Sequence, residues 1–589
     1  MSRTPRTVLI VLIAAWAVAC SPGGTGGEKP SAETAESLAA RVNTLADEYI
    51  KEYVSMFPEQ ATFLGLSGAD SSRLTDNSQA ALQAWRAKED AWSKALAAID
   101  GGSLWGRPEW VTAGFLKEAV DSSIDMRAAR PELMPVNHMS GWQAGLAQLA
   151  AVQPVGTDEA RTQALARWGA VPRYLDNEID ALRSGLGQGF TVPRLVVRLV
   201  VEQLDALLSM PAEESPFFNP AGRDGTPEFK NAWLKLMAEG ILPAVRRYRE
   251  FLGKEYLAGA RESIGVSALP GGRAMWEANF RANTSIKRTP EETFKLGEEA
   301  VARFESEASA LGLKLYGTAD LGTIRQKMAE DPRNHFRTRE EMMAFALETI
   351  SRARKALPDW FLTIPKADVT VLPHPAYLEK TASHQYESAA EDGSRPGTYR
   401  INLYQPDKQA RSTLEITTIH EAYPGHHFQI SLAMERPKAH LITRLLGNGG
   451  YIEGWARYSE ALAEEMGLYT SDFARIGRRI WPAHGMVVDP GIHILGWSRQ
   501  QAVDYVFATG RFSPHEAESL VDRIIAWPSQ LTSYDTGGLE FFALRAKAEK
   551  ELGKAFDIKS FHDEILKYGS VTLPMLREIV DRWIDGRRN

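Results

Sequence analysis

Three histidines and one glutamate lie within eight residues of the sequence, His420-Glu421-Ala422-Tyr423-Pro424-Gly425-His426-His427. Imidazoles and carboxylates are common protein ligands of zinc. In the ordinary H-E-x-x-H motif, two histidines four residues apart share one helix face, and the glutamate between them is a general base. Here the second histidine follows after six or seven positions, and Pro424 stands at the expected position. The segment therefore predicts zinc-peptidase chemistry only if the chain departs from a regular helix.

Helix geometry narrows the choice of the second ligand. On a regular helix, His427 would lie on the face of His420 but about 10 Å further along the axis, and His426 would point about 120° away. Neither pair could reach one zinc ion at about 2 Å. Pro424 removes a backbone donor and Gly425 tolerates unusual dihedral angles, so a two-residue bulge is expected there. Such a bulge makes His426 the predicted second ligand and His427 the alternative.

The third ligand is expected on a following helix. Glu453 comes soon after the glycine-rich break at 447–450, in the segment Tyr451-Ile452-Glu453-Gly454-Trp455-Ala456-Arg457-Tyr458-Ser459-Glu460. Buried carboxylates are costly without a partner, which favours Glu453 as a zinc ligand with Glu460 or Arg457 in support. A site of two histidines and one glutamate leaves the fourth zinc position for water. The alternative is that Glu453 only caps its helix.

Hydrolysis at such a site needs a base and an oxyanion donor. Glu421, adjacent to the ligand His420, is the predicted general base. Tyr534 is the predicted donor to the oxyanion that develops on the attacked carbonyl, and His493 is the second candidate. Each of these two side chains could instead be a packed structural residue.

Substrate contacts are predicted at two places. The strand Thr398–Leu403, with Tyr404 at its end, could pair with an extended peptide through its backbone edge, or could simply cover the core. Arg457 and Arg499 are candidates to bind a substrate carboxylate, although most arginines are structural or solvated.

The two motifs together resemble a known family. H-E-x-x-P-G-H-H followed by E-G-W-A-x-Y-x-E is similar to the bacterial family called domain of unknown function 885, grouped with the gluzincin type of zinc metallopeptidases. The resemblance is strongest between Tyr377 and Trp583, and it implies a zinc-dependent peptidase with an open choice of substrate. Further matching segments are 397–403, 489–493, 496–497, 533–534 and 561–563. Gly485 stands where the family leads us to expect an arginine, four positions before Asp489.

The elements that must position these residues are mainly helical. Apolar residues recur at spacings of three and four along most of the chain, and helix caps are expected at Thr289 and Ser513. The clearest predicted helices are 33–53, 78–99, 158–186, 230–256, 499–508, 514–525, 538–552 and 574–587. Strand patterns occur only at Asp368–Leu372 and Gly397–Tyr404, which could pair as a hairpin. We expect a mainly α, two-lobed, zinc-peptidase-like fold with a small β-sheet beside the active-site helix.

The length favours more than one domain. A chain of 589 residues exceeds a single ordinary core. We expect an N-terminal helical region at 32–280 and a catalytic region at 281–589.

The N-terminus predicts export. Arg3 and Arg6 precede the apolar run Val8–Ala19, and Cys20, the only cysteine, follows small residues. This pattern resembles a lipoprotein signal over 1–20 with lipidation at Cys20, followed by a flexible tether over 21–31. A plain cleaved signal is the alternative. A net charge of −7, with no basic stripe interleaved with aromatics, argues against a nucleic-acid partner.

Together these features predict a zinc metallopeptidase that acts on oligopeptides and is lipid-anchored in the bacterial envelope, in the periplasm or at the outer membrane. Its only expected membrane contact is the anchor at Cys20. The alternatives are an amidase acting on peptidoglycan stem peptides and a non-catalytic metal- or ligand-binding surface lipoprotein. Glu421 favours an enzyme, because a pure binding site does not need an acid beside a ligand histidine.

Overall fold

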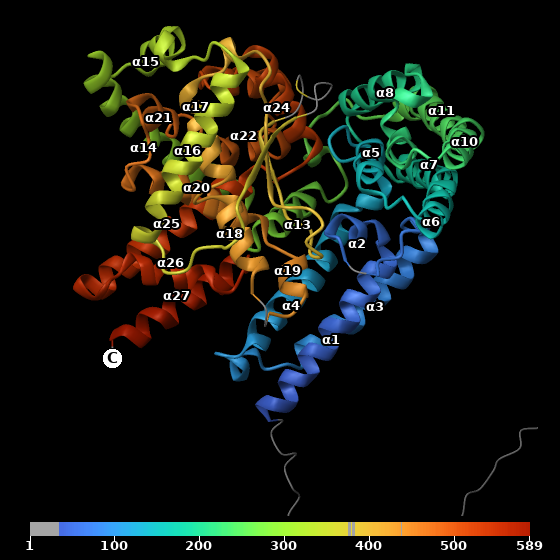
Figure 1. Cartoon of the computed structure of the whole chain (residues 1–589), viewed down its shortest axis with the longest axis horizontal. Coiled ribbons are helices and arrows are strands. Elements are labelled where there is room, and N and C mark those ends of the chain that lie inside the picture. Colours follow the sequence, from blue (N-terminus) through green and yellow to red (C-terminus); the bar gives the residue numbers. More distant parts are fainter. Residues whose placement is uncertain (1–33, 67, 375–378, 380–382, 437–438, 589) are drawn as a thin grey trace, which may run out of the picture.

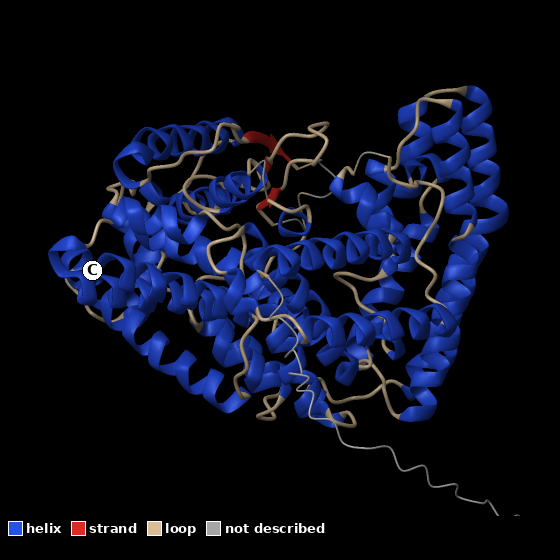
Figure 2. Cartoon of the chain, turned by 90° about the horizontal axis from the view of Figure 1, so that it is seen from below, coloured by secondary structure: helices blue, strands red, loops and turns tan. Residues whose placement is uncertain are grey.

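The computed structural model describes residues 34–66, 68–374, 379, 383–436 and 439–588. Helices dominate this part of the chain, and three short strands form one sheet (Figure 2). The predicted mainly α class with a small sheet is confirmed. None of the helices described here is both long enough and apolar enough to cross a membrane. Cys20 lies outside the described residues, so its lipidation stays a prediction.

The first helices begin where polar caps satisfy free backbone donors. Thr34 accepts a hydrogen bond from Ser37 at the start of α1 (Ala35–Met56), and Ser78 accepts one from Ala81 at the start of α3 (Gln79–Ala97). Between and after them lie α2 (Pro58–Leu64) and α4 (Pro108–Met126). These four helices lie together in the part of the molecule that is coloured blue in Figure 1.

A second group of helices occupies the region coloured teal to green in Figure 1. Its members are α5 (Trp142–Val152), α6 (Asp158–Gly169), α7 (Val171–Gln188), α8 (Arg194–Ser209), α9 (Asn219–Asp224), α10 (Pro227–Leu236), α11 (Leu242–Phe251) and α12 (Leu257–Gly259). The helix predicted at 158–186 is interrupted at Ala170, and Pro172 lies in the first turn of α7, where proline is tolerated because its missing N–H would have no helical partner. The helix predicted at 230–256 is helical throughout, with π-helical turns at Met237–Ile241 and Leu252–Tyr256 that separate α10, α11 and α12.

The remaining helices form the other side of the molecule (Figure 1). They are α13 (Gly272–Thr284), α14 (Pro290–Tyr316), α15 (Leu321–Glu330), α16 (Arg339–Trp360), α17 (Arg411–Glu421), α18 (His426–Met434), α19 (Ile442–Leu445), α20 (Gly449–Glu465), α21 (Asp472–Gly477), α22 (His484–His493), α23 (Arg499–Ala508), α24 (Pro514–Ala526), α25 (Thr532–Leu552), α26 (Ile558–Leu566) and α27 (Leu573–Arg588). The caps predicted at Thr289 and Ser513 are both capping boxes, at the starts of α14 and α24.

Two large hydrophobic cores hold these helices together. One joins α1, α3 and α4 to α17, α20 and α25–α27. The other joins α5–α11 to α22–α24. Each core therefore combines residues from both sides of position 280, and the domain boundary expected there stays a prediction.

The sheet differs from the predicted hairpin. Its strands are β1 (Thr370–Pro373), β2 (Gln385–Glu387) and β3 (Thr398–Ile401), in the order β1-β3-β2. The two predicted strands, β1 and β3, pair in parallel, so the hairpin prediction is wrong. The antiparallel partner of β3 is β2, whose three residues are too few to show an alternating pattern. β3 is thus the middle strand, and the prediction that it offers a free edge to a peptide is also wrong.

Helices α20 and α25 approach each other backbone to backbone at glycines. A Cβ on Gly454 would lie 2.5 Å from the backbone of Gly537. A Cβ on Gly537 would lie 1.7 Å from the carbonyl oxygen of Gly450. These positions require glycine, and the contact fixes α25 against the helix that carries Glu453.

Candidate metal centre

The segment His420–His427 forms two helices rather than one. Helix α17 ends at Glu421, α18 begins at His426, and four residues between them leave the helical path. The peptide bond before Pro424 is cis. The carbonyl of Pro424 accepts a hydrogen bond of 2.8 Å from the indole of Trp455 on α20. The break is therefore held in place by the helix that also provides Glu453.

Two backbone hydrogen bonds across the break span two residues more than a hydrogen bond of a regular helix does. Gly425 donates to Ile419 and Phe428 donates to Ala422, each across six positions instead of the helical four. The predicted two-residue excess is thus confirmed, but the predicted bulge within a continuous helix is wrong. A Cβ on Gly425 would lie 1.9 Å from the carbonyl oxygen of His420, so only glycine fits here.

The break brings His420 and His426 together with Glu453. Nε2 of His420 lies 3.5 Å from Oε2 of Glu453, and Nε2 of His426 lies 3.4 Å from the same oxygen. One ligand atom from each of the three residues falls within 4.8 Å of the others. His420 and His426 are 9% and 8% exposed, so the cluster is largely shielded from water.

These distances fit a shared cation better than direct hydrogen bonds. A tetrahedral zinc ion with ligand bonds of 2.0–2.1 Å places its ligand atoms about 3.3 Å apart. An N–H···O hydrogen bond is about 2.9 Å long. Oε2 of Glu453 is also buried without a hydrogen-bond partner in the described part of the chain. The residues present therefore fit a metal ion of the zinc type.

The tautomer of His420 supports this fit. Its Nδ1 donates a hydrogen bond of 2.8 Å to Glu460, so in a neutral His420 the lone pair of Nε2 is directed toward the Glu453 oxygen and is available to a metal ion. Burial opposes protonation of His420, but Glu453 and Glu460 outweigh burial and raise its pKa to about 10. Burial likewise opposes ionisation of Glu453, but His426 and His420 prevail and lower its pKa. The site thus favours a positive charge between these groups.

A chain of charged residues stands behind His420. Glu460 accepts hydrogen bonds from His420 and from Nη1 of Arg457, the latter at 3.0 and 3.1 Å. Nε of Arg457 lies 3.4 Å from the buried carboxylate of Asp535 on α25. Arg457, proposed either as support or as a substrate contact, is thus engaged by Glu460 and Asp535. Carboxylates that orient a ligand histidine in this way are common around protein metal sites.

Glu421 lies beside the cluster. Burial raises the pKa of its carboxyl group, while His420 and His426 act in the opposite direction. The backbone N–H of Tyr386 in β2 also favours the ionised form of Glu421. Strand β2 therefore lies near the predicted general base.

Tyr534 contacts the cluster from α25. Its ring stacks on His420 at a centroid distance of 6.3 Å, and Arg457 lies 5.7 Å from the same ring. Burial and Glu453 raise the pKa of Tyr534 to about 12, so its hydroxyl keeps its proton near neutral pH. Such a hydroxyl can donate a hydrogen bond.

His427 and His493, the two other histidines predicted as site residues, have their hydrogen-bond partners outside the cluster. His427 is fully buried, donates to the carbonyl of Ala367 and accepts from the hydroxyl of Tyr386. His493 in α22 donates to the carbonyl of Ile524 in the second core, and burial, together with the nearby Arg261, lowers its pKa to about 4. Both of these neighbours lie outside the cluster, which favours the alternative that His493 is a packed residue over its predicted role as an oxyanion donor.

The two remaining candidates for substrate binding are Arg499 and Tyr404. Arg499 forms a two-pronged ion pair with Asp522 at 2.7 and 3.0 Å, linking α23 to α24. Because Asp522 engages its guanidinium group in this way, the contact argues against a role of Arg499 in substrate binding. Tyr404 lies in the loop after β3, half-exposed, with its backbone held by Asn402 and Gln409.

Sequence reasoning missed two contributors to the site. Asp535 directly follows Tyr534, and its place next to a singled-out residue was the available signal. Tyr386 had no such signal, because its strand is only three residues long.

The fold and the buried cluster define a mainly α protein with a candidate metal centre. Residues 58–580 match the family described as "Bacterial protein of unknown function (DUF885)", and the chain belongs to that family. A solved structure, described as "the putative lipoprotein from Colwellia psychrerythraea", is 25% identical with a TM-score of 0.85, covering 94% of this chain and 100% of that one. A second, "a putative lipoprotein of unknown function from Shewanella oneidensis", is 19% identical with a TM-score of 0.74, covering 91% of this chain and 99% of that one. No curated protein matches the chain.

Proposed function

We propose that this protein is a zinc metallopeptidase that hydrolyses peptide bonds in oligopeptides. The observation that carries the proposal is the convergence of His420, His426 and Glu453 beside the buried carboxyl group of Glu421. Three protein ligands with an acid next to them are typical of catalytic zinc sites, whereas structural zinc sites usually have four protein ligands.

Each residue of the site has a role in this proposal. His420, His426 and Glu453 would hold the ion, which when bound lowers the pKa of a coordinated water to about 7 and polarises a carbonyl group. Glu421 would accept the proton of the attacking water and pass it to the leaving amine. Tyr534 would donate its hydroxyl hydrogen to the developing oxyanion.

The outer edge of β2 supports a peptide as substrate. This strand is at the edge of the sheet, and the backbone N–H of Tyr386 lies near enough to Glu421 to favour its ionised form. An extended peptide that pairs with a sheet edge places its own carbonyl groups at regular intervals along that edge. The predicted docking strand therefore moves from β3 to β2.

The location of the protein is also part of the proposal. We infer export and lipid anchoring at Cys20, as the sequence pattern over 1–20 predicts. The two solved structures named above are each described as a "putative lipoprotein", which supports the inference. Labelling the expressed protein with a palmitate analogue tests it, because Cys20→Ser should abolish the label.

Metal analysis and digestion of an oligopeptide library, with and without a chelator, test the function. Glu421→Gln should keep its metal and lose about 10²- to 10⁴-fold in rate. The exposed Glu239 gives a control, since Glu239→Gln should leave both properties unchanged.

Three results would redirect the proposal. An active Glu421→Gln variant would remove the assigned base. Metal binding without chelator-sensitive cleavage would favour a non-catalytic binding lipoprotein. Cleavage of peptidoglycan stem peptides, with the oligopeptide library left intact, would favour the amidase.

A further inference from the structure

A pocket of about 510 Å³ lies between the N-terminal helices and the segment that leads into α20. Its lining residues come from α1–α4, from α13, and from the two stretches 446–448 and 570–572. None of them belongs to the candidate metal centre or to its supporting carboxylates. Pockets of this size commonly enclose small organic ligands.

One wall of the pocket is aromatic. Tyr49 and Tyr53 stack at a centroid distance of 5.8 Å, and Trp85 packs edge-on against Phe57 at 5.5 Å. Phe115 of α4 extends the same wall. Aromatic faces of this kind bind apolar groups and also attract cations.

The floor of the pocket carries incompletely paired charge. Glu118 of α4 lines it and shares Arg281 with Asp125, at 3.1 and 3.2 Å, so two carboxylates meet one guanidinium. Oε1 of Glu118 is buried with no hydrogen-bond partner among the described residues. Burial and the neighbouring carboxylates of Asp121 and Asp125 oppose the ionisation of Glu118 and raise its pKa to about 7, although Arg281 favours the ion. Nη1 of Arg281 is likewise buried without a hydrogen-bond partner among the described residues. Two carboxylates thus share one guanidinium, and a further positive charge would balance the negative charge that remains.

We propose that the pocket binds a ligand with an aromatic body and one ammonium group, with the ammonium at Glu118 and the body against Tyr53 and Trp85. This chemistry is shared by free arylalkylamines and by the amino terminus of a peptide that begins with an aromatic residue. The inference does not depend on the proposed peptidase activity, since the pocket uses none of its residues.

Calorimetry and saturation-transfer NMR on the purified chain, with a chelator present so that no metal-dependent cleavage occurs, test the proposal. Phenethylamine should bind, and 3-phenylpropionate, which replaces the ammonium with a carboxylate, should bind at least tenfold more weakly. Glu118→Gln should reduce phenethylamine binding about tenfold, whereas Glu239→Gln should not change it.

A second variant tests the location without removing a charge. Ser122 lines the pocket, and Ser122→Phe should block binding by filling the space. Circular dichroism and the thermal midpoint show whether each variant is folded. Equal binding of the amine and the carboxylate, or unchanged binding by a folded Ser122→Phe protein, would overturn the proposal.

The two sources of the ligand are separated by a peptide pair. If the natural ligand is a peptide amino terminus, Phe-Ala-Ala should bind more tightly than phenethylamine, and N-acetyl-Phe-Ala-Ala should not bind. If it is a free amine, phenethylamine should bind at least as tightly as the tripeptide. Absence of binding by both phenethylamine and Phe-Ala-Ala would overturn the proposal.

Discussion

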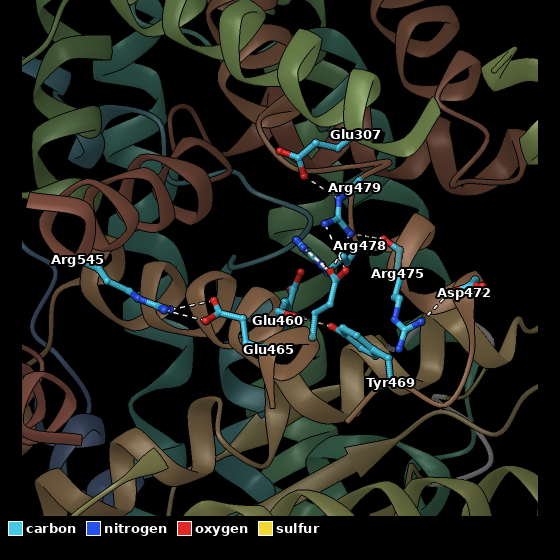
Figure 3. A network of polar contacts seen from close by, with 10 residues as sticks. Glu307, Glu460, Glu465, Tyr469, Asp472, Arg475, Arg478, Arg479 and Arg545 are labelled. Atoms are coloured by element: carbon cyan, nitrogen blue, oxygen red, sulfur yellow. Dashed lines mark hydrogen bonds and ion pairs between the residues drawn. The ribbon is translucent and has the colours of Figure 1, made fainter. Parts of the chain in front are cut away.

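Helix α20 carries glutamates near both of its ends, and the glutamates at the two ends differ in whether they are paired with arginine. At its C-terminal end, Glu464 pairs with Arg478 and Arg479, and Glu465 pairs with Arg545 (Figure 3). Arg479 also reaches Glu307 of α14 at 2.7 Å. Carboxylates and guanidinium groups thus alternate there, and each carboxylate has a cationic partner.

At the N-terminal end of the same helix, Glu453 faces Nε2 of two imidazoles instead, at 3.5 Å from His420 and 3.4 Å from His426. Its Oε2 has no hydrogen-bond partner in the described structure. The same helix carries the paired arrangement about three turns further on. The arrangement at Glu453 is incomplete, at a cost that a bound cation would remove. The comparison separates charges that are paired within the fold from a group of charges that fits a bound cation.

The largest expected effect comes from the ligand end. His426→Ala should lose bound zinc, because it removes one of three ligand groups, while His427→Ala should retain it. Zinc at a hundredfold excess over its dissociation constant should stabilise the unmodified protein by about 2.7 kcal/mol. That gain should vanish in His426→Ala, as thermal unfolding with and without zinc will show. Retained zinc in His426→Ala with loss in His427→Ala would reverse the ligand assignment.

An intermediate effect is expected at Glu460, which lies between the two ends. Glu460→Gln keeps a hydrogen-bond acceptor for His420 but removes the negative charge. Zinc affinity should fall about 10- to 100-fold, as is typical when a residue that orients a ligand is changed. Competition with a zinc-binding dye measures this, and Glu465→Gln at the fully paired end is the matched control. Equal losses of zinc affinity in Glu460→Gln and Glu465→Gln would contradict the proposed difference between the two ends of the helix.

The smallest effect on metal is expected at the paired end. Arg478→Met should leave zinc affinity unchanged and lower the free energy of unfolding by about 1–2 kcal/mol, since Glu464 is part-buried but keeps Arg479 as a partner. Urea unfolding of the metal-free protein measures the change. A loss of zinc in a folded Arg478→Met protein would show that the two ends are coupled.

Sequence patterns predicted the helices with strong local signals. The helix at 499–508 has the predicted bounds, because its start is specified by nearby residues, with Ser498 and Gln501 forming a capping box. The helix expected at 158–186 is interrupted at Ala170, just before Pro172, whereas the helix expected at 230–256 is helical throughout and contains two π-helical turns. Sheet pairing was not accessible in this way, because β1 and β3 are joined across 24 intervening residues.

Local sequence reasoning also predicted part of the geometry of the candidate site. Helix arithmetic indicated a two-residue excess before His426, and the hydrogen bonds of Gly425 and Phe428 span that excess. The arithmetic could not show that the indole of Trp455 holds the break, since that contact joins residues 31 positions apart. Nor could it place Arg499 or His493, whose surroundings depend on how distant helices pack.

The glycine contact between α20 and α25 also bears on motion. With no side chain between Gly454 and Gly537, the two helices cannot slide past each other without a backbone clash. Glu453 and Tyr534 therefore move as parts of one rigid body, and their separation is preserved through thermal fluctuations. The segment 388–397, which joins β2 to β3, lies outside this pair, and loops of that kind rearrange within nanoseconds to microseconds.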